Sequence, residues 1–342
     1  MRFKSLLCCL PLAACTILPL VQAQSGPYSV VDKWTVGGDG GWDYLTADPS
    51  AHLLYITHGT RVEVVDTKTG KSVGAITGLK GTHGVALDVI GQYGYISDGA
   101  GNNVVVFDRK SFAKIKSIPT GTNPDGIVFE PSTKTIWAFN GKSGDATVID
   151  TAAIKAVGTI KLSGKPEFPQ ADGKGTIFVN IETKNSIVRL DAKSMKVTAE
   201  WPLAGCDSPS GMAMDISGRK LFPVCDGKVM PVVDANSGTV LKLVPIGDGP
   251  DAAGYDAAHH LAFSSNGDGT LTIVDTSSPE YKVVQTLPTQ KSARTMAFDE
   301  STGRIYLAAA EMGARPATTA ENAHPRPSIV PGSFTVLVVS RK

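Results

Sequence analysis

The sequence has no excess of charge of either sign. Its 342 residues include 33 lysines and arginines and 32 aspartates and glutamates, which gives a formal net charge of +1. Nucleic-acid binding depends mainly on basic residues that neutralise phosphates, so nucleic acid is disfavoured as a partner. With 42% apolar and only 19% charged residues, the chain is too apolar to be disordered and can bury a large core.

Long apolar runs are also missing after the N-terminus, so no transmembrane span is expected in the mature chain. At the N-terminus, Arg2 and Lys4 precede an apolar stretch that ends at Ala23, a pattern typical of a secretory signal peptide. We therefore expect residues 1–23 to be removed and the protein to be periplasmic or secreted. In the alternative interpretation residues 12–15 form a lipobox and Cys15 carries a lipid anchor, but the apolar residues after Cys15 favour cleavage.

Cysteine is scarce, and three of the five cysteines lie within the predicted signal peptide. The other two, Cys206 and Cys225, are free to form a disulfide in an exported protein. Two buried thiols or a thiol ligand are the alternatives. The sequence also lacks a Gly-x-Ser-x-Gly elbow, a Cys-x-x-Cys-His haem site and a zincin motif, so no such motif indicates catalysis.

One unit of about 42 residues repeats along the chain, and the 36 glycines and 21 prolines favour many turns over long helices. The clearest signal is a short β-branched run that ends in an aspartate, at Asp66, Asp108, Asp150, Asp191, Asp234 and Asp275. A seventh run, residues 334–339, lacks the aspartate. We expect these aspartates to hold the following turns through side-chain hydrogen bonds to the backbone.

A second series in the same repeat confirms the period. An aromatic residue follows seven positions after each of Asp48, Asp88, Glu130, Ala171, Asp215, Asp256 and Asp299, and these residues are Tyr55, Tyr95, Trp137, Phe178, Phe222, Phe263 and Tyr306. We expect the aromatic residues to form the core. Four short strands per repeat predict an all-β fold, a seven-bladed β-propeller with four antiparallel strands per blade. Residues 24–342 then form a single domain, with the propeller at about 30–340.

The two ends of the repeat region predict how the ring closes. Residues 31–36 match the fourth strand of a repeat but precede the first complete one, and the last repeat stops after its third strand. We therefore expect the N-terminal strand to complete the C-terminal blade, which would remove two exposed sheet edges.

The repeats resemble the YVTN-repeat, or YncE-like, β-propeller family. The resemblance rests on residues 118–150 and on the tetrads Tyr55-Ile-Thr-His58, Tyr95-Ile-Ser-Asp98 and Trp137-Ala-Phe-Asn140. It covers nearly the whole mature chain and implies the propeller fold. It implies no single chemistry, because related propellers include binding proteins, scaffolds, nucleic-acid binders, lactonases and lyases.

Two sets of residues are predicted to meet at one mouth of the central channel. The first ring lies five residues before the acid of a repeat and comprises Asp43, His83, Asp125, Ser210, Asp251 and Arg294, with Glu167 in the shortened fourth repeat. The second ring lies at the end of each second strand and comprises His58, Asp98, Asn140, Cys225, Asn266 and Ala309, with Asn180 or Glu182 in the fourth repeat. The polar members other than Ser210, Cys225 and the uncertain Asn180 or Glu182 are the candidate ligand-binding residues. Each also fits the role of a solvated turn residue.

The acids of these rings would repel one another around a shared axis unless protons or a cation relieved them. A divalent cation is one possible cofactor, with Asp43, His83, Asp125 and Asp251 as candidate ligands, but no metal-binding motif such as His-x-His is present and the cofactor does not follow from the sequence. Arg294 offers a different chemistry, because a guanidinium can bind a carboxylate or a phosphate through two parallel hydrogen bonds.

The last repeat contains a proline-rich insertion, residues 312–332, which leaves from the predicted mouth. We expect a lid over the channel that brings Arg315, His324 or Arg326 to the mouth. A surface loop without function is the alternative.

The sequence thus predicts an exported binding module that holds a small ligand, a metal ion or a partner protein at an acidic, lidded mouth, and that acts as a monomer. One alternative is a lactonase-like, metal-dependent hydrolase or lyase in which His58 or His83 moves the proton. Another is a protein-interaction scaffold. Neither the ligand nor the presence of catalysis follows from the sequence.

Overall fold

The computed structural model describes residues 26–314, 318 and 327–342. The predicted signal peptide, with Cys15, and the predicted lid residues Arg315, His324 and Arg326 lie outside the described residues.

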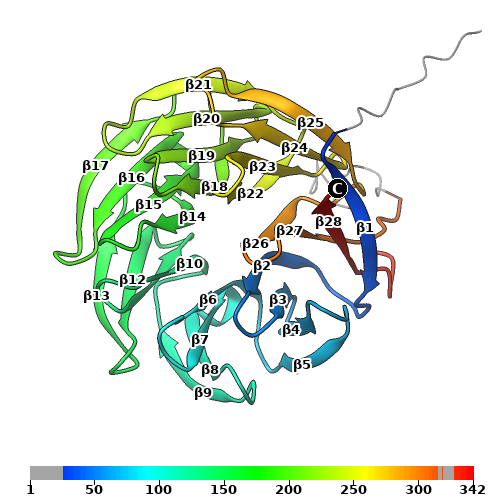
Figure 1. Cartoon of the computed structure of the whole chain (residues 1–342). Coiled ribbons are helices and arrows are strands. Elements are labelled where there is room, and N and C mark those ends of the chain that lie inside the picture. Colours follow the sequence, from blue (N-terminus) through cyan, green and yellow to red (C-terminus); the bar gives the residue numbers. More distant parts are fainter. Residues whose placement is uncertain (1–25, 315–317, 319–326) are drawn as a thin grey trace, which may run out of the picture.

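In the part of the chain that the structure describes, seven four-stranded antiparallel sheets surround a central channel (Figure 1). This confirms the predicted seven-bladed β-propeller. The innermost strands are β2 (Trp42–Asp48), β6 (Thr82–Leu87), β10 (Pro124–Glu130), β14 (Pro166–Ala171), β18 (Pro209–Asp215), β22 (Pro250–Asp256) and β26 (Thr295–Asp299). The second strands are β3 (Leu53–His58), β7 (Tyr93–Asp98), β11 (Thr135–Asn140), β15 (Thr176–Ile181), β19 (Lys220–Cys225), β23 (Leu261–Asn266) and β27 (Arg304–Ala309).

The third strands, which end in the predicted aspartates in six blades, are β4 (Arg61–Asp66), β8 (Asn103–Asp108), β12 (Asp145–Asp150), β16 (Ser186–Asp191), β20 (Val229–Asp234), β24 (Thr270–Asp275) and β28 (Thr335–Arg341). The outer strands are β5 (Ser72–Ile76), β9 (Lys114–Pro119), β13 (Lys155–Lys161), β17 (Lys196–Pro202), β21 (Val240–Pro245), β25 (Lys282–Pro288) and β1 (Tyr28–Thr35). Two short 3₁₀ turns, Gly99–Gly101 and Glu182–Lys184, follow β7 and β15.

The ring closes as the sequence predicts, since β1 is the outer strand of the blade that contains β26, β27 and β28. β1 pairs antiparallel with β28 from Tyr28 opposite Arg341 to Thr35 opposite Thr335 (Figure 1). The Gln285 side chain of the neighbouring blade also holds β1. It accepts a hydrogen bond from the Tyr28 backbone N–H at 3.0 Å and donates one to the Tyr28 carbonyl at 2.9 Å.

The core lies between the blades. All seven aromatic residues predicted for it, from Tyr55 to Tyr306, have no exposed surface. The predicted turn role of the strand-end aspartates is confirmed too. In the first blade, for example, the Asp66 carboxylate accepts hydrogen bonds from the backbone N–H groups of Lys68 and Thr69 at 3.0 and 2.8 Å. Scaffold residues therefore account for the most regular features of the repeat.

A disulfide joins Cys206, just before β18, to Cys225 at the end of β19, with a Cα–Cα distance of 5.5 Å. The two cysteines are 19 positions apart, so the cross-link stabilises the fold by about 3 kcal/mol through the entropy of the unfolded chain.

No helix among the described residues has both the length and the apolar character needed to cross a membrane.

Candidate functional site

The innermost strands pack closely at the mouth because a glycine follows several first-ring residues. A Cβ atom at Gly126, next to Asp125, would lie 2.4 Å from the backbone oxygen of Glu167 in the next blade. A Cβ atom at Gly211 would lie 2.6 Å from the backbone oxygen of Asp251 in the next blade. Only glycine permits this approach, which brings first-ring residues of adjacent blades together.

Hydroxyl groups at the ends of the second strands fix the backbone of the first ring. Thr57 donates a hydrogen bond to the carbonyl of His83 at 3.0 Å, and Ser97 donates one to the carbonyl of Asp125 at 2.6 Å. Ser265 donates in the same way to the carbonyl of Arg294. Each bond crosses from one blade to the next, so the position of a first-ring residue depends on its neighbouring blade.

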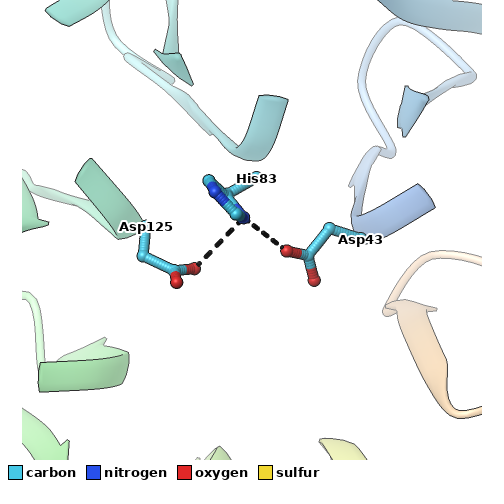
Figure 2. Close-up of side chains that lie close together, drawn as sticks. All are labelled: Asp43, His83 and Asp125. Atoms are coloured by element: carbon cyan, nitrogen blue, oxygen red, sulfur yellow. Dashed lines mark hydrogen bonds and ion pairs between the residues drawn. The ribbon is translucent and has the colours of Figure 1, made fainter. Parts of the chain in front are cut away.

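Asp43, His83 and Asp125, from the adjacent strands β2, β6 and β10, point toward one another in the channel (Figure 2). His83 Nδ1 lies 2.7 Å from Asp43 Oδ2 and 3.7 Å from Asp125 Oδ1. One nitrogen or oxygen atom from each residue can be chosen so that all three lie within 4.8 Å of one another. The side chains are 12–27% exposed, so the group is recessed but reachable from solvent.

The protonation states of this group depend on one another. Burial, and then the charge of Asp43, raise the pKa of Asp125 to about 6, while burial raises that of Asp43 despite its hydrogen bond to His83. Burial alone would lower the pKa of His83, but the hydrogen bond to Asp43 and the charges of Asp125 and Asp43 outweigh it and raise this pKa to about 9. At neutral pH, His83 is therefore an imidazolium held between two carboxyl groups.

A second charged group lies beside the first. Lys165 pairs with Glu167 and with Glu182. Burial and the charge of Asp125 raise the pKa of Glu167 to about 8, although Lys165 opposes this shift. Lys165 belongs to neither predicted ring, although the repeat pattern marks its position as unusual. Two positions before the first ring, the other repeats carry only Gly, Asn or Ser.

Asp251 and Arg294 form a third group, with 2.9 Å between Asp251 Oδ2 and Arg294 Nη1. Burial raises the pKa of Asp251 although the Arg294 charge opposes it. The structure therefore brings three of the four candidate metal ligands together, while Asp251 pairs with a guanidinium.

Tyr44 and Phe168 lie below the charged groups, with ring centroids 4.9 Å apart. Burial and the charges of Asp125, Asp43, Glu167 and Asp251 raise the pKa of Tyr44 well above its ordinary value. Beyond this pair, toward the opposite face, the channel becomes an apolar cavity of about 510 Å³ whose lining includes Leu87, Phe129 and Phe298. The charged groups built around Asp43, His83 and Asp125 thus lie at one end of this apolar cavity.

Glu182, the alternative second-ring residue of the fourth repeat, reaches the mouth through its pair with Lys165. The other polar second-ring side chains are buried and do not open into the mouth, so their predicted placement is wrong. The His58 ring is fully buried and lies 4.2 Å from the Phe334 ring, with Nδ1 3.1 Å from Arg61 Nη2. The carboxylate of Asp98 accepts the backbone N–H groups of Lys80 and Gly81, both at 2.8 Å. Both side chains serve turns and blade contacts.

Asn140 and Asn266 are likewise fully buried and bonded inside their own blades. Asn140 donates to Asp145 and Thr147 at 2.7 and 3.0 Å, and Asn266 donates to Thr270 and Thr272 at 3.0 and 3.1 Å. The physical reason is the alternation of side chains along a strand. The residue one position earlier, such as Thr57 or Ser265, faces the innermost strand of the next blade.

The base of the insertion lies beside the mouth. Met312 forms a β-bridge with Ile329, and both line a cavity of about 640 Å³ together with Trp42 and Arg294. The lid function stays a prediction, since Arg315, His324 and Arg326 fall in the undescribed part.

No family model and no curated protein matches the chain. Among solved structures it is similar to "Kuenenia stuttgartiensis Hydrazine Synthase" with a TM-score of 0.70 and 19% identity, over 85% of this chain and 95% of that chain. It is also similar to the chain in "Structure of U3-55K" with a TM-score of 0.73 and 10% identity, over 92% and 99%. At such identities the likeness shows the β-propeller fold alone.

Proposed function

We propose that this protein is an exported β-propeller binding module that holds a divalent cation at its channel mouth through Asp43, His83 and Asp125. One observation carries the proposal: side chains from three separate blades place a nitrogen and two carboxylate oxygens within 4.8 Å of one another. The three residues are distant in sequence and recessed in the channel, so they indicate a binding site more strongly than acids scattered on a surface would.

The ligand chemistry favours a first-row divalent metal ion such as Zn²⁺, Mn²⁺ or Co²⁺. One imidazole and two carboxylates suit these ions, whereas Ca²⁺ prefers six to eight oxygens. Glu167 and Asp251 lie nearby, and burial together with the charge of Asp125 raises the pKa of both carboxyl groups. A dication at this position would favour their ionised forms.

A cation at this position has to replace the proton on His83 Nδ1. Metal ligands bind in their deprotonated form, so binding would release protons to the buffer. Water or a small ligand would complete the coordination from the open side of the mouth.

Export is part of the proposal. It is supported by the basic and apolar pattern of residues 1–23 and by the Cys206–Cys225 disulfide, a bond typical of oxidising compartments. Intact mass of the exported protein tests it. Cleavage after Ala23 supports a free form, and a lipidated N-terminus at Cys15 supports the anchored alternative.

We also assign the chain to the YVTN-repeat propellers as a proposal, on the strength of the tetrads that end β3, β7 and β11. The hydrolase alternative has less support. One of its two proton carriers, His58, is buried against Phe334, and the other, His83, is held by two carboxyl groups.

The test is titration calorimetry of the metal-free full protein with Zn²⁺ and with Mn²⁺, in two buffers of different protonation enthalpy. We expect one ion per chain, proton release, and binding at least tenfold weaker in Asp125→Asn. Asp207→Asn is the matched control, because Asp207 is exposed just before β18 and lies outside the group. Absence of stoichiometric binding, or equal affinity in Asp125→Asn, would reject the metal site.

A further inference from the structure

A second cavity adjoins the mouth. It has a volume of about 640 Å³, within the range of small-molecule sites, and lies between the base of the insertion and the blades on either side. Trp42, Met312, Pro327 and Ile329 give it apolar walls.

The polar part of this cavity carries charge of one sign. Lys291 and Arg294 line it, and none of the described lining residues is acidic. An apolar wall facing two cations fits a molecule with an apolar body and one anionic end. This contrasts with the Asp43, His83 and Asp125 group, where acids predominate.

Arg294 is held in place before any ligand arrives. Its Nη1 pairs with Asp251 at 2.9 Å, and its carbonyl accepts hydrogen bonds from Ser265 and from the Ala252 backbone N–H. The side chain is still 43% exposed, so part of the planar fork faces solvent. The neighbouring Asp251 charge disfavours a dianion such as phosphate and favours a single carboxylate.

The apolar wall is also fixed by backbone contacts. Gly313 donates to the Ser328 carbonyl at 2.7 Å, and Val330 donates to the Glu311 carbonyl at 2.8 Å. Ser292, another lining residue, donates through its hydroxyl to the Ala310 carbonyl at 2.9 Å. The described base of the insertion therefore forms a wall of defined position.

From these observations we infer that this cavity binds a small monocarboxylate with an aromatic or branched apolar body. The carboxylate pairs with Arg294 and Lys291, and the apolar part packs against Trp42, Met312 and Ile329. This site goes beyond the proposed cation site and uses none of its three ligands.

The experiment compares three probes of nearly equal shape, 4-phenylbutyrate, 4-phenylbutyramide and 4-phenylbutylamine, by calorimetry and tryptophan fluorescence on the full protein. We expect saturable binding of the acid, at least tenfold weaker binding of the amide, and none of the amine. Arg294→Gln should weaken acid binding at least tenfold, and Lys291→Gln should weaken it less. Lys228→Gln, at a surface lysine whose side chain is 58% exposed, should leave it unchanged.

Asp125→Asn separates the two proposals, because it should remove metal binding and retain acid binding. If Arg294→Gln lowers the melting temperature strongly, Ile329→Asp replaces it, since a carboxylate in the apolar wall should abolish acid binding by repulsion. Equal affinity for acid and amide, unchanged binding in both variants, or no saturable binding of the acid by the wild-type protein would overturn the inference.

Discussion

The two ends of the central channel differ completely in chemistry although the same seven strands form both. Asp43, His83 and Asp125 lie at one end, and two positions along the same strands stand Leu45, Val85 and Ile127, which line the apolar cavity. In each of these three strands the register of pairing shifts just before the apolar residue, so the change in chemistry coincides with an irregularity in the innermost strand. Packing fixes the apolar end, and the mouth is the part of the channel that the fold leaves available for chemistry.

The largest expected effect comes from placing a charge at the apolar end. Leu87 is 7% exposed in the core between blades, so Leu87→Asp buries an unpaired carboxylate. We expect the free energy of unfolding to fall by about 4 kcal/mol, measured by urea denaturation. Asp125→Asn at the mouth is the comparison, and it should change this energy by less than about 1 kcal/mol. Similar losses in both variants would mean that the mouth is as structural as the apolar end.

A somewhat smaller effect is expected from the acids that close the apolar end. Asp48 is 4% exposed and pairs with Arg109 of the next blade, which also donates to the Asp88 carbonyl at 2.9 Å. Arg109→Gln leaves this carboxylate buried without its partner and should cost about 3 kcal/mol in urea denaturation. Asp48→Asn in the same background should recover part of the loss. A loss that does not depend on Asp48 would contradict this account.

The residues of the mouth should instead make the stability of the fold depend on pH. The pKa of Glu167 is raised from its ordinary 4.5 to about 8, so the folded state keeps a proton that the unfolded chain releases. Its contribution to stability is present below pH 4.5 and is lost as pH rises through about 8. His83, raised from 6.5 to about 9, loses its contribution as pH rises through about 9.

We therefore expect the melting temperature to fall from about pH 4.5 to about pH 9. Glu167→Gln should remove the part of this dependence that lies between pH 4.5 and about 8 and leave the His83 part in place. Thermal melts across this range provide the measurement. A profile that rises with pH, or one that Glu167→Gln leaves unaltered, would show that these acids ionise independently of folding.

The smallest effect is expected at the boundary between the two ends. Tyr44→Phe keeps the ring that contacts Phe168 and removes a hydroxyl from among the mouth acids. Stability in urea should change by less than about 1 kcal/mol, whereas Tyr44→Ala removes the ring contact and should cost several times as much. Comparable effects of both substitutions would place the role of Tyr44 in its hydroxyl.

The repeat pattern was sufficient to predict the blades, the strands, the closure and the first ring, because each follows from counting residues along a regular unit. The second ring failed for a reason that counting does not reveal. The Asn140 side chain bonds within its own blade and the His58 ring packs against Phe334 of the last blade, whereas the preceding residue, such as Thr57, faces the innermost strand of the next blade. Which atoms meet between two neighbouring blades depends on tertiary packing, as the hydrogen bond from Thr57 to the His83 carbonyl illustrates.

The pairing of β1 with β28 has a consequence for the order of folding. The two strands lie near opposite ends of the sequence, so the last blade can be completed only after almost the whole chain has been synthesised. Until then β27 has no outer partner and β1 is unpaired, so the incomplete ring has open strand edges that favour pairing with other chains.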